Sequence, residues 1–270
     1  MTTTRELREA AGEEPITMLT AYDATTARLI DDCGIDILLV GDSMGTEALG
    51  YDSTLPVTVE EVESRTAAVA RGSDNALVVA DMPFLSVGVD ESETIRNAGR
   101  MLKEADADAV KLESGPHTVD VTERLTQLGI PVMAHLGLTP QHINQLGGYT
   151  RQGTTEAAAE EILSLARAHE AAGAFALVLE HVPANVAAQV TDDLDIPTIG
   201  IGAGGDCDGQ VLVIDDVLGL SEEAPPFAEQ FGDVRAAMTD AIEAYKAAVD
   251  DGEFPTAEHS HIEAGLDDLS

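Results

Sequence analysis

Short apolar runs alternate with longer amphipathic stretches along most of the chain. The runs are rich in Val, Ile and Leu and are nearly continuous, a pattern typical of parallel strands that are buried on both faces. Eight such runs predict strands over residues Ile16–Ala21, Ile35–Asp42, Ala76–Asp81, Ala109–Ser114, Pro131–Gly137, Ala176–Glu180, Pro197–Gly202 and Gln210–Ile214.

The stretches between these runs carry apolar residues at helical spacing. Thr58 directly precedes one stretch and has the spacing of a capping box to Glu61, which marks the start of a helix. The pattern predicts helices over residues Ala24–Asp32, Val59–Ala70, Glu91–Ala105, Thr118–Leu128, Thr155–Ala172, Ala184–Val190 and Phe227–Val249.

The alternation of strands and helices favours a (β/α)8 TIM barrel, because eight such units occupy about 250 residues. The alternative is a doubly wound open sheet, which usually has a glycine-rich turn after its first strand. Here the first strand leads into Tyr22-Asp23-Ala24 instead. The chain shows no repeat, linker or break in composition. We therefore expect a single barrel domain over residues 1–257 and an acidic C-terminal tail over residues 258–270.

The charge balance excludes several classes of partner. The 270 residues contain 14 Lys and Arg against 50 Asp and Glu, a formal net charge of −36. A protein that binds nucleic acid or an anionic membrane needs a basic face, so neither partner is expected. Only three of the cations are lysines, and such a surface suits molar salt, where the Debye length is about 3 Å. An ordinary acidic cytosolic protein is the alternative to a halophilic one.

The cysteines and the N-terminus indicate a cytoplasmic protein. Cys33 and Cys207 lie far apart, without metal-ligand spacing, and we expect two free thiols in a reducing compartment. The N-terminus is polar and shows no secretory signal. No apolar run approaches the roughly 18 residues needed to span a membrane.

Acidic residues stand where the predicted strands end, and barrel enzymes carry their chemistry at those ends. Asp42 and Asp81 close the second and third strands, and Glu113 lies on the fourth. Three converging carboxylates would repel one another without a cation, and all-oxygen ligation favours Mg²⁺. The alternative is that each Asp only caps the next helix. We favour a metal site formed by Asp42, Asp81 and Glu113.

Three further residues are candidates for the chemistry. Lys111 points to the same side of its strand as Glu113 and could hold an anionic substrate or stabilise an enolate. A buried ion pair is the alternative, and Schiff-base chemistry is less favoured beside a metal. His135 is either a core histidine or a contact to the substrate or cofactor. Glu180 ends an apolar strand and could act as a base, or could pair with His181.

Nine short segments, in order along most of the chain, resemble the ketopantoate hydroxymethyltransferase (3-methyl-2-oxobutanoate hydroxymethyltransferase) family. These segments are Thr20–Asp23, Leu39–Ser43, Asp52–Thr58, Ala80–Phe84, Val110–Glu113, His135–Pro140, Gly147–Tyr149, Leu179–Pro183 and Ile199–Gly204. Each segment alone is modestly specific, but together they are highly specific. The greater acidity and the extension after His261 depart from the family pattern without touching the candidate site.

The resemblance implies a barrel of the phosphoenolpyruvate/pyruvate type. Its members transfer a hydroxymethyl group from 5,10-methylenetetrahydrofolate to 3-methyl-2-oxobutanoate, giving 2-dehydropantoate on the route to pantothenate and coenzyme A. By resemblance, Asp42 and Asp81 ligate Mg²⁺ with Glu113 at or near the metal. Asp42, Ser43, Asp81 and Lys111 would contact the oxo acid, and Glu180 matches the proton acceptor. The family forms large homo-oligomers, often decamers.

Two alternatives share parts of this pattern. Another magnesium-dependent oxo-acid lyase or mutase of the same barrel superfamily would keep the acidic cluster but lack the ordered set of segments. A non-catalytic barrel that binds an oxo acid or a pterin would not need the complete set of polar residues at the strand ends. The intact set favours the hydroxymethyltransferase interpretation.

Overall fold

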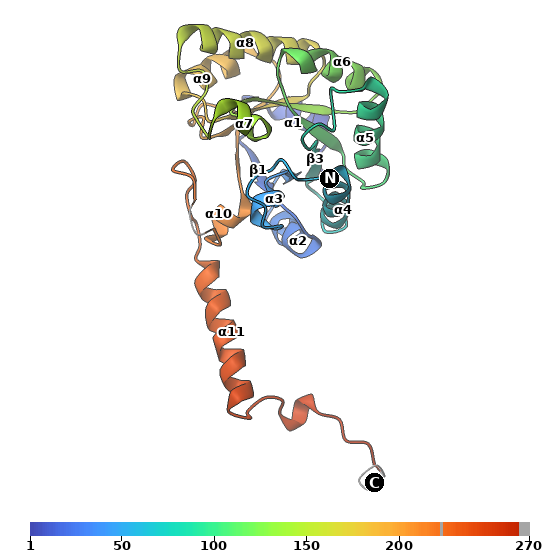
Figure 1. Cartoon of the computed structure of the whole chain (residues 1–270), viewed down its shortest axis with the longest axis vertical. Helices are drawn as coiled ribbons and strands as arrows, with labels where there is room; N and C mark the ends of the chain where they lie inside the picture. The colour runs from blue at the N-terminus through green and yellow to red at the C-terminus, as the bar shows by residue number, and fades with distance from the viewer. Residues whose placement is uncertain (222–223, 265–270) are drawn as a thin grey trace. The chain divides into compact units, whose positions relative to one another are not determined.

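Residues 1–214 are built around a closed barrel of eight parallel strands (Figure 1). The structure is a computed structural model that describes residues 1–221 and 224–264. The strands follow the chain order, and β8 closes the barrel by pairing with β1. Their bounds are β1 Ile16–Thr20, β2 Ile37–Val40, β3 Leu77–Asp81, β4 Ala109–Glu113, β5 Val132–Gly137, β6 Ala176–Glu180, β7 Thr198–Ile201 and β8 Gly209–Leu212. The predicted (β/α)8 barrel is therefore confirmed.

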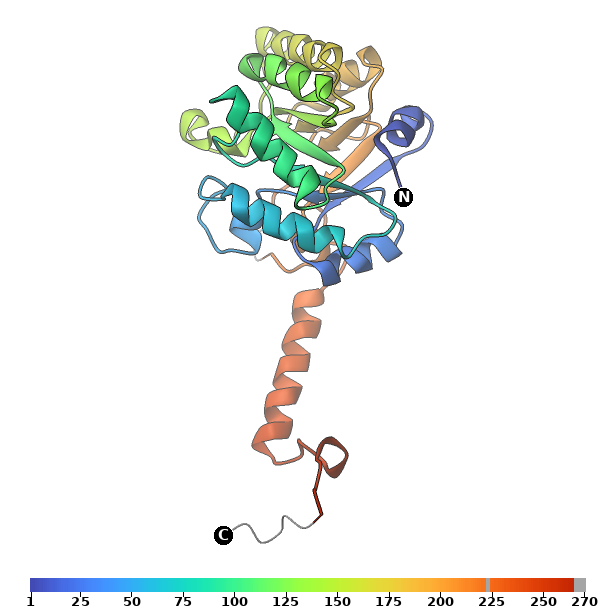
Figure 2. The ribbon, with the colours of Figure 1, turned by 90° about the vertical axis from the view of Figure 1, so that its right-hand side faces the viewer.

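Six helices cover the outside of the barrel, each packed against the next one along the chain (Figure 2). Thr58 and Glu61 form the predicted capping box at the start of the second of these helices. The six helices are α2 Ala24–Asp32, α4 Val59–Ala70, α5 Glu91–Lys103, α6 Val119–Gln127, α8 Glu156–Ala171 and α9 Ala184–Asp193. All six predicted helices of this region are confirmed, with ends that differ by up to three residues.

The N-terminal helix α1 (Thr4–Ala10) was not predicted, because only Leu7 of its side chains is buried. Leu7 packs in one cluster with interior side chains of the strands, including Met18, Leu77 and Met133. The short helices α3 (Met44–Glu47), α7 (Ile143–Leu146) and α10 (Ile214–Leu218) were also not predicted, since one turn leaves no periodic signal.

The contacts divide the chain into two compact units. The first comprises residues 1–214 and 225–228, and the second comprises residues 215–224 and 229–270. The second contains α11 (Val234–Asp250), which begins seven residues after the predicted start, where Asp233 caps it. The predicted boundary between a barrel over 1–257 and a tail over 258–270 stays a prediction, and residues 265–270 of that tail lie outside the described residues.

A membrane-spanning helix was not expected from the sequence. Within the described parts of the chain, none of the helices combines the length and the apolar character that crossing a bilayer requires.

Candidate active site

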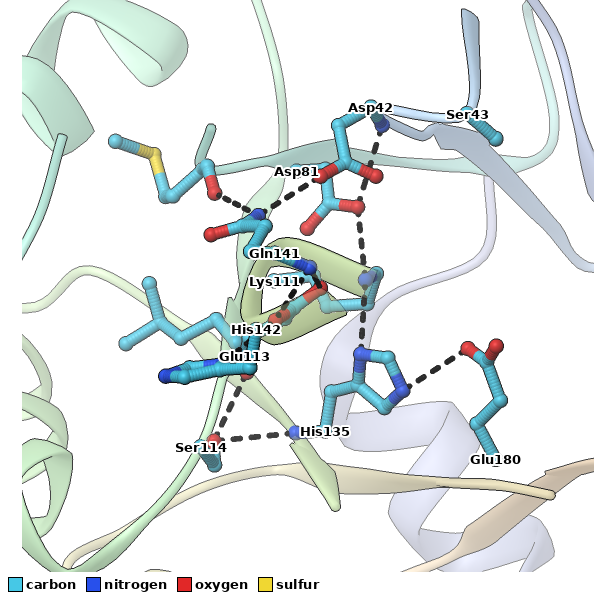
Figure 3. A network of polar contacts seen from close by, with 12 residues as sticks. Asp42, Ser43, Asp81, Lys111, Glu113, Ser114, His135, Gln141, His142 and Glu180 are labelled. Atoms are coloured by element: carbon cyan, nitrogen blue, oxygen red, sulfur yellow. Dashed lines mark hydrogen bonds and ion pairs between the residues drawn. The ribbon is translucent and has the colours of Figure 1, made fainter. Parts of the chain in front are cut away.

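The C-terminal ends of the strands enclose a buried cavity of about 110 Å³. Parallel strands in a barrel all end on the same side, so residues far apart in the sequence meet there. All seven predicted site residues line this cavity: Asp42, Ser43, Asp81, Lys111, Glu113, His135 and Glu180. Figure 3 shows the polar contacts among them.

Lys111 and Asp81 form an ion pair inside the barrel wall. They occupy paired positions on β4 and β3, and Lys111 Nζ lies 2.8 Å from Asp81 Oδ2. The backbone N–H of Asp42 donates to the same oxygen at 3.3 Å. The other oxygen, Asp81 Oδ1, is buried and has no hydrogen-bond partner in the described structure. Asp81 therefore presents one free carboxylate oxygen within the cluster.

The electrostatics of the cluster favour a bound cation. Burial and the nearby charges of Asp81 and Glu113 raise the pKa of Asp42 well above its usual value. Burial alone would lower the pKa of Lys111, but the charges of Asp81 and Asp42 outweigh it and raise this pKa. Three carboxylates thus face one lysine, and an added cation would offset the remaining negative charge.

Two residues from the turn after β5 bind the carboxylates of this cluster. The backbone N–H of Gln141 donates to both oxygens of Glu113, at 3.0 and 3.2 Å, and His142 Nδ1 lies 3.3 Å from Glu113 Oε2. The side chain of Gln141 donates to Asp42 Oδ2 at 2.8 Å. These contacts fix the two carboxylates from one side (Figure 3).

A second line of contacts runs from the ammonium group of Lys111 to the other side of the cavity. Lys111 Nζ lies 3.4 Å from His135 Nδ1, and His135 Nε2 lies 3.1 Å from Glu180 Oε2. His135 is 2% exposed, whereas the Glu180 side chain is 17% exposed and reaches the cavity. The carboxylate of Glu180 is thus separated from the acidic cluster by Lys111 and His135.

Ser43 follows Asp42 at the start of α3, where its hydroxyl lies 2.9 Å from the hydroxyl of Tyr22. Tyr22 is buried directly after β1, so the contact ties the ends of β1 and β2 together. Ser43 thus lines the cavity with a hydroxyl that is held in place by Tyr22.

The polar cluster fits a hard divalent cation through its donor set. Asp42 and Asp81 supply only oxygen atoms, and Asp81 Oδ1 is free to bind. Across residues 1–221 and 224–264, the His, Cys, Asp and Glu side chains form no group of three arranged to hold a metal ion. Both oxygens of Glu113 accept from Gln141 instead, so a direct role of Glu113 as a ligand stays a prediction.

Sequence reasoning missed Tyr22, Gln141 and His142 as members of the site. Gln141 and His142 follow Pro140 in a turn, and neither the spacing nor the charge of that turn indicates that it folds back over the cavity. The nearest signal was their position directly after the segment His135–Pro140.

Comparisons with known proteins show the family to which the chain belongs. The family model described as ketopantoate hydroxymethyltransferase matches residues 1–257. The chain is similar to a 3-methyl-2-oxobutanoate hydroxymethyltransferase of Haloarcula marismortui, with 70% identity over 269 residues that cover 100% of both chains. A protein of the same name from Geobacter metallireducens is 52% identical over 253 residues, covering 93% of this chain and 94% of the relative.

Solved structures show the same fold at low sequence identity. A phosphoenolpyruvate phosphomutase from Streptomyces platensis matches with a TM-score of 0.61 and 16% identity, covering 93% of this chain and 88% of that one. A 2,3-dimethylmalate lyase of the phosphoenolpyruvate mutase/isocitrate lyase superfamily matches with a TM-score of 0.57 and 18% identity, covering 97% and 92%. These likenesses show the barrel fold of the chain.

Proposed function

From the premise that the chain belongs to the ketopantoate hydroxymethyltransferase family, we propose how its barrel carries out the reaction of that family. The protein is an enzyme that transfers a hydroxymethyl group to 3-methyl-2-oxobutanoate, giving 2-dehydropantoate in pantothenate biosynthesis. The convergence of Asp42, Asp81, Lys111 and Glu180 on one buried cavity carries the proposal. A volume of about 110 Å³ suits a small oxo acid.

Asp42 and Asp81 would hold a Mg²⁺ ion, with Glu113 at or near it. The free oxygen Oδ1 of Asp81 and the surplus of carboxylates in the cavity support this assignment. When bound, the ion supplies Lewis-acid polarisation of the 2-oxo group, which acidifies the hydrogen on C3 of the substrate.

Lys111 and Ser43 would bind the oxo acid. The ammonium group of Lys111 is fixed by Asp81 at 2.8 Å, so it offers positive charge to the substrate without reorganisation. The same charge stabilises the enolate that forms when C3 loses its proton. The Ser43 hydroxyl, oriented by Tyr22, is a further hydrogen-bond donor for the substrate.

Glu180 would accept the proton from C3. It is a carboxylate at the edge of the cavity, held apart from the acidic cluster and within reach of His135. The C3 carbon then forms a bond to the methylene carbon of the donor, proposed to be 5,10-methylenetetrahydrofolate, as one of the two bonds from that carbon to the folate nitrogens breaks. Water replaces the second folate nitrogen, which completes the hydroxymethyl group. The proton taken from C3 and one proton from water pass to the two nitrogens, so that tetrahydrofolate is released.

We also propose that the protein is a cytoplasmic homo-oligomer. Met238, Ile242, Tyr245 and Val249 recur at helical spacing along α11, and each is between 44% and 63% exposed. A second copy of the chain would cover this apolar stripe. Light scattering of Ile242→Asp against Glu243→Gln tests this, because only the first change should reduce the oligomeric mass.

The enzyme proposal is tested by incubating the purified protein with 3-methyl-2-oxobutanoate, methylenetetrahydrofolate and Mg²⁺ in high KCl. We expect 2-dehydropantoate to form, and chelation of Mg²⁺ by EDTA to stop its formation. The absence of product under these conditions, from protein that is shown to be folded, would refute the enzyme proposal. Product formation that persists after chelation would overturn the magnesium assignment alone.

A further inference from the structure

We propose that Gln141 is a positioning residue that orients the Asp42 carboxylate for the divalent cation, an inference that rests on the magnesium site proposed above. Gln141 lies in the turn after β5, whereas Asp42 follows β2. Its side chain nevertheless reaches across the cavity mouth, and Gln141 is only 8% exposed. Figure 3 shows its amide directed at Asp42.

The amide group of Gln141 has both of its N–H bonds engaged. Nε2 donates to Asp42 Oδ2 at 2.8 Å and to the backbone oxygen of Met82 at 3.0 Å. Both partners are acceptors, so the amide nitrogen must face them and the orientation of the group is unambiguous. Because the carbonyl of Met82 directly follows β3, it anchors the amide while the second N–H holds the carboxylate.

The backbone of Gln141 fixes the turn from which this side chain extends. Its N–H donates to both carboxylate oxygens of Glu113, at 3.0 and 3.2 Å. One residue therefore links the ends of β2, β3 and β4, which carry all the predicted metal ligands. These backbone contacts do not depend on the side chain, so substitution at this position can remove the contact to Asp42 alone.

A neutral donor is suited to this position. A lysine would neutralise Asp42 and compete with the cation, and a glutamate would add a fourth acid to the cluster formed by Asp42, Asp81 and Glu113. An amide restricts the rotation of the carboxylate and leaves its charge for the metal. Residues that orient metal ligands in this way typically contribute about 10–100-fold to metal affinity.

The experiment compares Mg²⁺ binding by wild-type protein and Gln141→Met, measured by titration calorimetry in high KCl without substrate. Methionine keeps the length of the side chain but cannot donate a hydrogen bond. We expect the dissociation constant for Mg²⁺ to rise about tenfold or more. We expect the thermal unfolding midpoint to change little, since the backbone contacts to Glu113 remain.

Gln189→Met is the matched control, because Gln189 is exposed on α9 and bonds only within its own helix in the described contacts. If Gln141→Met does not fold, Gln141→Asn keeps the amide, and its shorter reach should also weaken binding. Unchanged or tighter Mg²⁺ binding by a folded Gln141 variant would overturn the positioning role. Wild-type protein that binds no Mg²⁺ would overturn the magnesium site itself, and this inference with it.

Discussion

The Nε2 atom of His135 lies 3.1 Å from Oε2 of Glu180, although the two atoms are not aligned as a hydrogen bond. The other ring nitrogen lies 3.4 Å from Lys111 Nζ. An ammonium group can only donate, so Nδ1 must be the acceptor and the proton of a neutral ring sits on Nε2. In that tautomer, the N–H of His135 lies close to the carboxylate of Glu180.

Replacing His135 with Asn separates these two contacts. The Asn side chain can still accept from Lys111 but cannot reach Glu180. We expect kcat to fall about tenfold or more, below the 10²–10⁴-fold contribution of a positioned base itself. Steady-state kinetics should show little change in KM for the oxo acid. A raised KM with unchanged kcat would instead indicate that His135 binds the substrate directly.

Replacing Glu180 and replacing Asp81 should impair the enzyme in different ways. Glu180→Gln removes the proposed proton acceptor, and we expect kcat to fall by about 10²-fold or more with Mg²⁺ affinity retained. Asp81→Ala removes the free oxygen Oδ1 and the partner of Lys111, so Mg²⁺ affinity should fall together with activity. Calorimetry with Mg²⁺ on both variants checks the division of roles. Equal loss of Mg²⁺ affinity in both would contradict it.

The sequence predicted the barrel and six of the seven candidate residues because both depend on regular patterns, whereas the role of Ser43 came from the family resemblance. Buried parallel strands are continuous apolar runs, and a polar residue that ends such a run, such as Asp81 or Glu180, must lie at one end of the barrel. Gln141 could not be found in this way. Its role depends on the path of an irregular turn, which no periodicity encodes.

The start of α11 shows a similar limit. Residues 227–233 match helical spacing at Phe227, Ala228 and Phe231, but the helix begins only after Asp233. The capping side chain of Asp233 determines where the helix begins, despite the apolar pattern before it. Gly232, just before Asp233, disfavours an extension of the helix toward Phe227.

Gly137 should be required where β5 ends beside Glu180. The backbone angle φ of Gly137 is positive, +99°, and an added Cβ would lie 2.2 Å from the backbone oxygen of Glu180. Gly137→Ala must displace this backbone, so we expect a loss of roughly 3 kcal/mol or more in stability and a large loss of activity. Chemical denaturation and kinetics measure both effects.

Gly129→Ala provides the matched control for Gly137→Ala. Gly129 also has positive φ, +84, but an added Cβ would meet no atom within 4 Å. We expect this variant to lose only about 1–2 kcal/mol, the cost of the left-handed backbone, and to keep its activity. Equal losses in the two variants would show that the close approach to Glu180 is unimportant.

Asp31 should stabilise the folded protein at neutral pH, and this stabilisation should be lost at low pH. Burial alone would raise its pKa, but donors from residues 73–76, including the backbone N–H of Ala76 at 2.7 Å, lower this pKa to about 2. Its folded pKa is below the unfolded value, so its stabilisation is complete above about pH 4 and is lost toward pH 2. This shift in pKa corresponds to roughly 2 kcal/mol in the free energy of unfolding.

Asp31→Asn should therefore destabilise the protein by a few kcal/mol at neutral pH, and the difference from wild type should shrink as the pH falls below 4. Denaturant unfolding at several pH values in high KCl measures it. Asp32→Asn is the control, since Asp32 is the next residue of α2 and is exposed. A difference between wild type and Asp31→Asn that does not depend on pH would refute the ionic contribution.

The large negative charge should make folding depend on salt. The formal net charge is −36, and only a few acids belong to the cavity, so most of the repulsion arises outside it. Lowering KCl from about 1 M to 0.1 M lengthens the Debye length from about 3 to 10 Å, which strengthens repulsion between surface carboxylates. We expect unfolding and loss of activity as KCl is lowered, with both followed on the same samples.

A variant with fewer surface charges distinguishes repulsion from a specific need for potassium ions. Glu160, Glu161 and Asp192 are exposed on α8 and α9, away from the cavity-lining residues. Replacing all three by their amides should shift the KCl midpoint of unfolding to lower salt and leave kcat in high KCl unchanged, because repulsion falls while the site stays intact. An unshifted midpoint, or full stability of the wild-type protein in dilute buffer, would show that surface repulsion does not set the salt requirement.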